Sequence, residues 1–299
     1  MNSHLTRRQA LGGLLAVGLL ASVPRTALAT PSPNTGTLDL KGIEHRHRAR
    51  IGAYAVDLGA AATVEHRADE RFAMCSTFKA YAAGRVLQLV DQSRLDLRTP
   101  IPVNAADIVA NSPVTEQRVG ATMALAEVCE AALTRSDNAA GNLLLRTIGG
   151  PGGVTAFART LGDEQTRLDR WETELNSAIP GDVRDTTTPR GLCWGYRQLL
   201  TGTALSPSAR ATLDGWMRAN VTSGPRFRAA VPAGWTTADK TGAGDYGSTN
   251  DAGLILGPAR QRVTAVVLTR SIDDQKDTPP LNAAISDTVR LILDSFGYR

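Results

Sequence analysis

The position of the predicted β-strands constrains the fold of this 299-residue chain more than any other feature of its sequence. Residues 50–58 alternate as a strand does, whereas the other clear strand patterns come much later, at 235–240, 251–256 and 262–270. The residues between them have mostly helical patterns. We therefore predict an α/β (α+β) fold, in which an antiparallel sheet covered by terminal helices is joined to a second, all-helical lobe.

The helical patterns set the expected lobe boundaries. Helices are expected over residues 78–90, 123–134, 139–149, 189–200, 206–219 and 281–296. Residues 162–188 have weak periodicity and many polar residues, which predicts a long ordered loop. We expect residues 41–66 and 220–299 to form the sheet lobe and residues 67–219, with this loop, to form the helical lobe. A cleft between two lobes is a favoured place for a ligand.

The first 29 residues have the parts of an export signal in their usual order. A paired arginine, Arg7-Arg8, precedes an apolar stretch over residues 11–23, and Ala27-Leu28-Ala29 supplies a cleavage pattern. The paired arginine favours the twin-arginine (Tat) route, with the general secretory route as the alternative. Thirteen apolar residues are too few to span a bilayer, which needs about 20. We expect an exported, periplasmic or extracellular protein with no membrane span after cleavage.

The charge balance changes when this segment is removed. The whole chain has 33 basic and 29 acidic residues, a net charge of +4 and a pI near 9.2. Residues 1–29 contain three arginines and no acidic residue, so cleavage leaves 30 basic and 29 acidic residues and a net charge of +1. This near-neutral balance argues against a nucleic-acid partner or an anionic membrane surface. Residues 30–40, rich in Pro, Thr and Ser, are expected to form a disordered lead-in.

The three cysteines are Cys75, Cys129 and Cys193. Export permits disulfides, but an odd count leaves at least one thiol free, and the spacings match no compact metal motif. We interpret all three as small buried residues, with a Cys129–Cys193 bridge as the open alternative. We expect neither a metal nor a cofactor.

The first chemical motif is Ser76-Thr77-Phe78-Lys79, at the start of a predicted buried helix. The three-residue spacing places the serine and the lysine on one helix face, one turn apart. A serine hydroxyl becomes a good nucleophile only when a base takes its proton, and a buried lysine with a lowered pKa can be that base. The structural alternative is a helix-capping serine beside a surface lysine. Only four lysines occur in the chain, and a buried one needs a reason.

Two tripeptides offer groups that can complete such a site. Ser136-Asp137-Asn138 follows an apolar helix; its serine can pass a proton and its asparagine can hold a carbonyl, although Ser and Asp are also common helix caps. Lys240-Thr241-Gly242 ends a predicted strand. Its lysine and threonine suit a carboxylate, and the glycine allows close backbone approach. The alternative for Lys240-Thr241-Gly242 is a strand that ends in a turn.

The fourth motif lies in the long loop. Glu172 and Asn176 are four residues apart and can hold one water molecule between them if that turn is helical. Arg170 is expected to pair with Asp185 across the loop and pin it. The alternative is a charged, solvated loop.

Together and in this order, the four motifs resemble those of the class A serine β-lactamases, and the resemblance spans residues 38–298. It implies a five-stranded antiparallel sheet and a monomeric enzyme that opens the β-lactam ring of penicillins and cephalosporins and so confers antibiotic resistance. The implied catalytic residues are Ser76 as nucleophile, Lys79 as proton shuttle, Ser136 as proton donor to the leaving nitrogen and Glu172 as base for the hydrolytic water.

The resemblance also implies the substrate contacts. They are Asn138 on the side-chain amide of the drug, Asn176 on the water, Lys240, Thr241 and Gly242 at the carboxylate, the N–H groups of Ser76 and Ala243 at the oxyanion, and Arg226 as an auxiliary cation.

The sequence departs from the family pattern at several positions. Thr249 stands at one usual place of the auxiliary arginine, which is why we assign that role to Arg226. Asn111 stands where members of the family often have an aromatic residue that can stack on the substrate. Ala83 stands where many members have the cysteine that bridges to the Cys129 position, so no such bridge is expected. Ala243 is neither Ser nor Thr, which argues against specialised cephalosporin or carbapenem activity.

Two other functions compete with the lactamase. A cell-wall DD-peptidase would share the Ser76, Ser136 and Lys240 motifs, but Glu172 and Asn176 favour hydrolysis over a long-lived acyl-enzyme. A non-catalytic receptor for the drug would need a membrane tether or a fused domain, and neither is found in the sequence after residue 29.

Overall fold

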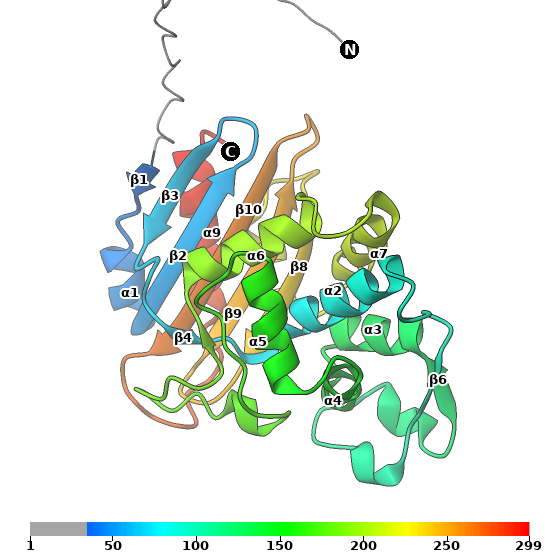
Figure 1. Cartoon of the computed structure of the whole chain (residues 1–299). Helices are drawn as coiled ribbons and strands as arrows, with labels where there is room; N and C mark the ends of the chain where they lie inside the picture. The colour runs from blue at the N-terminus through cyan, green and yellow to red at the C-terminus, as the bar shows by residue number, and fades with distance from the viewer. Residues whose placement is uncertain (1–34, 299) are drawn as a thin grey trace, which may run out of the picture. The chain divides into compact units, whose positions relative to one another are not determined.

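A six-stranded sheet forms the centre of the molecule in the computed structural model, which describes residues 35–298 (Figure 1). Its strand order is β1-β3-β2-β10-β9-β8, and neighbours are antiparallel except for β1 and β3. The bounds are β1 (Thr35–Thr37), β2 (Ala49–Asp57), β3 (Ala62–His66), β8 (Thr236–Ala243), β9 (Thr249–Leu256) and β10 (Arg262–Ser271). The strands of the N-terminal and C-terminal regions thus meet in one sheet, as the sequence predicts.

The edge of the sheet corrects two expectations. The sheet has a sixth strand, because β1 adds to β3 in parallel. Residues 35–40, expected to be disordered, are ordered: Leu38 and Leu40 are buried, and the Leu38 N–H donates to the Glu65 carbonyl at 2.9 Å. The prediction of disorder rested on the Pro, Thr and Ser content of the whole segment and gave no weight to its two leucines. Both leucines belong to the apolar core beneath the sheet. The predicted signal at residues 1–29 lies outside the described residues.

Nine helices occur within the described residues. They are α1 (Lys41–His47), α2 (Phe78–Asp91), α3 (Leu125–Thr134), α4 (Asn138–Thr147), α5 (Pro151–Thr160), α6 (Pro189–Leu200), α7 (Pro207–Arg218), α8 (Phe227–Ala230) and α9 (Asn282–Ser295). The six predicted helices are present, and none of their ends differs by more than two residues from the predicted one. Helix α5 was not predicted because Gly152 and Gly153 follow Pro151 at its start, although proline suits the first turn of a helix.

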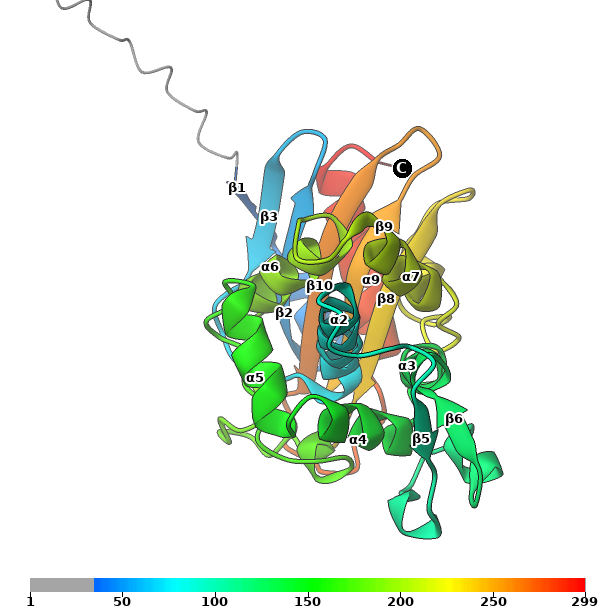
Figure 2. The same ribbon diagram turned by 45° about the vertical axis from the view of Figure 1, so that its right-hand side comes forward.

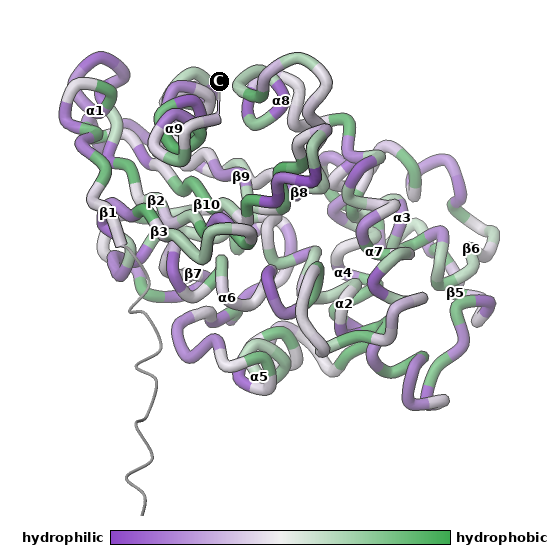
Figure 3. The backbone as a smooth tube through the Cα atoms, turned by 90° about the horizontal axis from the view of Figure 1, so that it is seen from above, coloured by the Kyte–Doolittle hydropathy of each residue, from purple (hydrophilic) through white to green (hydrophobic). Residues whose placement is uncertain are grey.

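The helices cover both faces of the sheet (Figure 3). Helices α1, α8 and α9 pack on one face around a core that includes Ile51 and Ile285. On the other face, α2 lies in the middle of the helical layer and contacts α3, α4, α5, α6 and α7 (Figure 2). The larger core joins these helices to the sheet, because it contains Phe78 as well as Val266. The functional segments therefore meet where helices and sheet share a core.

Short elements tie the long loop to this frame. Strand β7 (Thr186–Thr187) closes the loop by pairing with β4 (Phe72–Ala73), the strand that leads into Ser76. Strands β5 (Pro100–Pro102) and β6 (Thr122–Ala124) form a second small ribbon. No helix among residues 35–298 combines the length and the apolar character that a bilayer crossing requires.

All three cysteine side chains are buried and free. The structure therefore excludes the Cys129–Cys193 bridge and agrees with the interpretation of the cysteines as small buried residues. Burial raises the pKa of each thiol, that of Cys193 to about 12, so all three stay protonated at neutral pH.

Candidate active site

Ser76 lies in a single 3-10 turn, Cys75–Thr77, that leads directly into α2. The turn is held from several sides: Tyr196 Oη donates to the Thr77 carbonyl at 2.7 Å, and Asn250 Nδ2 donates to the Ala73 carbonyl at 2.9 Å. Cys75 has a φ of 45°, an unfavourable left-handed conformation for this residue type. The packing around the turn thus fixes the serine hydroxyl in a strained but well-supported position.

Lys79, one turn along α2, is fully buried and surrounded by acceptors. Its Nζ lies 3.0 Å from Ser76 Oγ, 2.9 Å from Glu172 Oε1, 2.9 Å from the Ser136 carbonyl and 2.7 Å from Asn138 Oδ1. Three segments that are far apart in the sequence therefore converge on one ammonium group. Since both Ser76 and Glu172 are in contact with it, the lysine can exchange a proton with either.

Glu172 reaches the nucleophile directly. Ser76 Oγ donates to Glu172 Oε1 at 3.2 Å, and Asn176 Nδ2 donates to Glu172 Oε2 at 2.5 Å. The expected pairing of Glu172 with Asn176 is therefore present, and Asn176 ends a short 3-10 turn, Glu174–Asn176, that begins two residues after Glu172. The Oδ1 atom of Asn176 is buried without a hydrogen-bond partner among the described residues. An unfilled acceptor beside a carboxylate is a suitable place for a water molecule.

Sequence reasoning missed Asn142, which holds the main chain of Glu172. The Glu172 N–H donates to Asn142 Oδ1 at 2.9 Å, and Asn142 Nδ2 donates to the Glu172 carbonyl at 3.0 Å. Asn142 lies one turn after Asn138 on α4, so the two amides share a helix face. The four-residue spacing of the two asparagines indicates that they share a helix face. No residue near Asn142 in the sequence indicates that it contacts the loop around Glu172.

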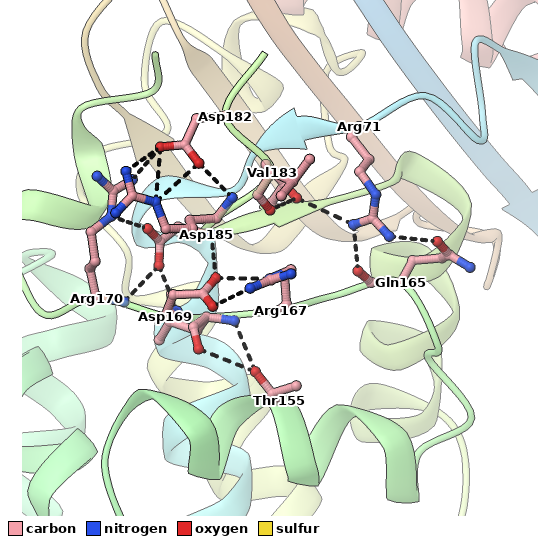
Figure 4. Close-up of polar contacts among 12 residues, drawn as sticks. Arg71, Thr155, Gln165, Arg167, Asp169, Arg170, Asp182, Val183 and Asp185 are labelled. Carbon is pink, nitrogen blue, oxygen red and sulfur yellow. Dashed lines mark hydrogen bonds and ion pairs between the residues drawn. The ribbon is translucent and has the colours of Figure 1, made fainter. Parts of the chain in front are cut away.

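The base of the long loop is closed by the predicted ion pair (Figure 4). Arg170 Nε donates to Asp185 Oδ2 at 2.5 Å, and the N–H groups of Asp169 and Arg170 donate to Asp185 Oδ1 at 2.7 and 2.9 Å. Arg170 also reaches Ser177 Oγ at 2.9 Å and lies 3.7 Å from Asp182. The loop is thus a folded unit that carries Glu172, and the alternative of a merely solvated loop is excluded.

Ser136 connects the two buried lysines. It has a φ of 56°, which presents its carbonyl to Lys79 and its hydroxyl to Lys240, whose Nζ donates to Ser136 Oγ at 3.0 Å. The cap of α4 is supplied by Asp137 instead, which accepts from the Ala140 N–H at 2.8 Å and from Thr115 Oγ1 at 2.8 Å. The capping role falls to the aspartate, and the serine is left free for other contacts.

Both amide atoms of Asn138 are engaged within the protein. Its Oδ1 accepts from Lys79, and its Nδ2 donates to the Ala110 carbonyl at 2.9 Å. The Asn138 N–H also donates to the carbonyl of Asn111, the residue found in place of the expected aromatic wall. The structure therefore places Asn138 at the lysine; its role toward a substrate amide stays a prediction.

Strand β8 brings Lys240 to the nucleophile. A Cβ atom on Gly242 would lie 2.9 Å from the Met74 carbonyl, so only glycine allows this strand to pass so close to the turn before Ser76. Burial, followed by the positive charges of Lys79 and Arg226, holds the pKa of Lys240 well below its ordinary value. The Thr241 hydroxyl bonds to that of Thr222, a residue that sequence reasoning did not single out.

Arg226 lies against the end of β8. Its Nη1 donates to the carbonyls of Gly242 and Asn250, both at 2.8 Å, and its Nε donates to Asn282 Oδ1 at 2.8 Å. Burial lowers the pKa of this guanidinium. The residue thus fastens β8 and β9 to α9 and places a buried positive charge beside Lys240.

The geometry suits acyl transfer through a serine. The Ser76 hydroxyl contacts both a carboxylate and a lysine. Ser136 bonds one lysine through its carbonyl and a second through its hydroxyl, and the loop carboxylate lies beside an amide oxygen without a partner. No cluster of three or more metal-ligating side chains occurs within residues 35–298.

Known proteins share this sequence and fold. A profile of the Beta-lactamase enzyme family matches residues 38–296. Beta-lactamase AST-1 of Nocardia asteroides is 45% identical over 285 residues, 95% of this chain and 89% of that protein, and a beta-lactamase of Streptomyces lavendulae is 44% identical over 97% of both chains. The solved structure of an ancestral (GNCA) class A beta-lactamase matches with a TM-score of 0.82 at 46% identity, covering 86% of this chain and 98% of that one.

Proposed function

The chain belongs to the class A serine β-lactamases, and from this we propose how its own residues hydrolyse β-lactam antibiotics. The reaction, which confers resistance, has two stages: transfer of the acyl group to a serine and hydrolysis of the ester formed.

In the first stage Ser76 Oγ attacks the lactam carbonyl. Glu172 takes its proton, either directly across the 3.2 Å contact or through Lys79, whose Nζ lies 3.0 Å from the hydroxyl and 2.9 Å from Glu172 Oε1. The N–H groups of Ser76 and Ala243 hold the oxyanion. As the C–N bond breaks, Ser136 Oγ gives its proton to the lactam nitrogen. Lys240 replaces that proton, because its Nζ lies 3.0 Å from Ser136 Oγ and a lowered pKa makes it a better donor. The proton taken from Ser76 then restores Lys240, so Glu172 is again a carboxylate when the second stage begins.

In the second stage a water molecule bound between Glu172 and Asn176 attacks the ester. The unpartnered Oδ1 of buried Asn176 supports this position. Glu172 takes the proton of the water and Ser76 regains its own, so the product leaves as an opened ring with a new carboxylate.

Substrate binding is assigned to the end of β8. Lys240 and Thr241 hold the carboxylate that penicillins and cephalosporins carry, and Gly242 lets the end of β8 lie close to the turn before Ser76. Arg226 adds the positive charge of a guanidinium held against the Gly242 carbonyl. Asn138 is assigned to the amide of the substrate side chain, which requires it to exchange one of its present partners for the substrate.

The observation that carries this proposal is the contact of Glu172 Oε1 with both Ser76 Oγ and Lys79 Nζ. A DD-peptidase shares the serine and the lysines, but this loop carboxylate gives the enzyme its own means of deacylation. That difference favours hydrolysis of the drug over lasting acylation.

We further propose that residues 1–29 direct export by the Tat route, and that the mature enzyme is a monomer. The paired arginines and the cleavage pattern of the sequence support the first point.

The mature enzyme should be assayed against a penicillin, a cephalosporin and a carbapenem. We expect rapid turnover of the penicillin, lower turnover of the cephalosporin and little of the carbapenem, because Ala243 lacks a hydroxyl. Stoichiometric acylation of Ser76 without turnover would contradict the proposal.

A further inference from the structure

A second pocket lies at the opposite edge of the sheet from β8, between α6 and the strands β2 and β3. Its volume is about 410 Å³, within the usual range for small-molecule sites. In Figure 1, α6 crosses in front of these strands. The residues that line the pocket and carry the argument are Tyr54, Asp57, Ala61, Arg190, Trp194 and Arg197. None of them belongs to the site around Ser76.

The walls of this pocket are mostly apolar. Tyr54 and Val56 project from β2, and Trp194, with 45% of its surface exposed, stands on α6 at the opening. A large tryptophan left half exposed beside a pocket is the kind of surface on which an apolar group of a ligand packs. Thr264, paired with Val56 across the sheet, has a buried hydroxyl with no partner among residues 35–298.

Three charged side chains line the pocket: Asp57, Arg190 and Arg197. Asp57 is occupied elsewhere, because its Oδ1 accepts from the Gly59 N–H at 2.8 Å and its Oδ2 accepts from Tyr298 Oη at 2.6 Å. Arg190 stacks on Tyr54 and is paired with Asp69 at 2.8 Å. Both oxygens of Asp57 are therefore bonded to donors that do not line the pocket, and the guanidinium of Arg190 is already paired with a carboxylate.

Arg197 is the exception. It lies one turn from Trp194 on α6 with its guanidinium 5.8 Å from the indole ring, and no carboxylate in the described part of the chain forms an ion pair with it. Arg197 lines the pocket together with the buried Cys193, and its positive charge partly offsets the effect of burial, which raises the pKa of that thiol. An unpaired guanidinium beside an aromatic wall is complementary to a carboxylate attached to an apolar group.

We propose that this pocket is a second small-molecule site, which binds a monocarboxylate bearing an aromatic or branched apolar group. The carboxylate pairs with Arg197, and the apolar part lies between Tyr54 and Trp194.

The probe is 4-phenylbutyrate, titrated calorimetrically into the mature enzyme at low salt, with its neutral amide as the charge control. We expect one site with a Kd on the order of 1 mM, as a ligand of this size allows, and no measurable binding of the amide. Arg197→Gln should weaken binding about tenfold or more. Arg85→Gln, which removes another guanidinium stacked on an aromatic ring, 5.7 Å from Phe157 and outside the pocket, should leave it unchanged.

A second pair of variants tests the pocket without removing any contact of α6. Ala61 lines the pocket in a left-handed conformation, φ 52°, that Asp and Asn both tolerate. Ala61→Asp adds a negative charge and should weaken binding of the carboxylate several-fold, whereas Ala61→Asn should not. No binding at 10 mM, equal binding of the amide, or binding that survives both Arg197→Gln and Ala61→Asp would overturn the proposal. The site at Lys240 also accepts a carboxylate, so binding that survives both variants would place the ligand there and not in the pocket beside α6.

Discussion

Two buried carboxylates, Glu172 in the catalytic cluster and Asp185 at the base of the loop, are each paired with a cation, yet their surroundings differ in kind. Asp185 accepts from two backbone N–H groups and a guanidinium, none of which gives up a proton at neutral pH. Glu172 faces a serine hydroxyl and an ammonium group, and both can transfer a proton. The chemistry of the donors therefore separates a carboxylate that holds the structure from one that reacts.

The largest effect should come from removing the hydroxyl that joins the catalytic cluster. Ser76→Ala should reduce nitrocefin hydrolysis by about 10⁴-fold or more, because no covalent intermediate can form. The thermal midpoint should change little. Ser295→Ala, the same change at an exposed position, is the control. Retained turnover in Ser76→Ala would refute the assignment of the nucleophile.

Replacing the reactive carboxylate should stop the reaction at its midpoint. Glu172→Ala should slow hydrolysis of the ester by on the order of 10³-fold, the size expected for loss of a general base. The acyl-enzyme should then accumulate as a stable adduct in intact-mass spectra. Glu174→Ala, two residues away and exposed, should show no adduct. Rapid turnover without an adduct would show that another group activates the water.

Replacing Asp185, the carboxylate that holds the loop, should affect the stability of the protein more than its catalysis. Asp185→Ala leaves the Arg170 guanidinium and two N–H groups without their partner and should lower the free energy of unfolding by about 3 kcal/mol. A fall in kcat/KM of roughly tenfold should accompany it, since the loop that carries Glu172 loosens. Urea unfolding curves measure the first effect and penicillin kinetics the second.

The matched control for that variant is Asp182→Ala. Asp182 pairs with Arg184, half of whose side chain is exposed, and its distance of 3.7 Å from Arg170 is too long for a hydrogen bond, so this loss should cost less than about 1 kcal/mol. Equal losses from Asp182→Ala and Asp185→Ala would show that burial does not distinguish the two ion pairs.

The smallest effect is expected at Arg226, a cation with fixed partners that borders the reactive cluster. Arg226→Ala should raise KM for penicillins by about tenfold and change kcat much less, because the lost charge acts on substrate binding. Arg228→Ala, on a guanidinium bonded to the Arg218 carbonyl, is the control. An unchanged KM would remove Arg226 from the substrate site.

The sequence was most informative where the chemistry is local. Ser76 and Lys79 share a helix turn, and Arg170 and Asp185 bracket one loop, so spacing alone suggested both pairs. It was less informative where contacts cross between segments. Nothing near Asn142 indicates that it holds the main chain of Glu172, thirty residues later.

The edge of the sheet shows the same limit. Leu38 and Leu40 stand in a polar stretch, and their burial follows only from the position of α9 and the sheet. Secondary-structure propensity depends on a residue and its neighbours in the sequence. The order of residues 35–40 depends also on an apolar core that includes residues from the C-terminal part of the chain.

The pairing of β2 with β10 has a consequence for biosynthesis. Strand β2, near the N-terminus, pairs through all nine of its residues, Ala49–Asp57, with the last strand of the chain. Until residue 271 has left the ribosome, the backbone edge of β2 that pairs with β10 has no partner strand. The nascent chain must therefore be protected from aggregation through nearly its whole synthesis, and the sheet closes only when translation is almost complete.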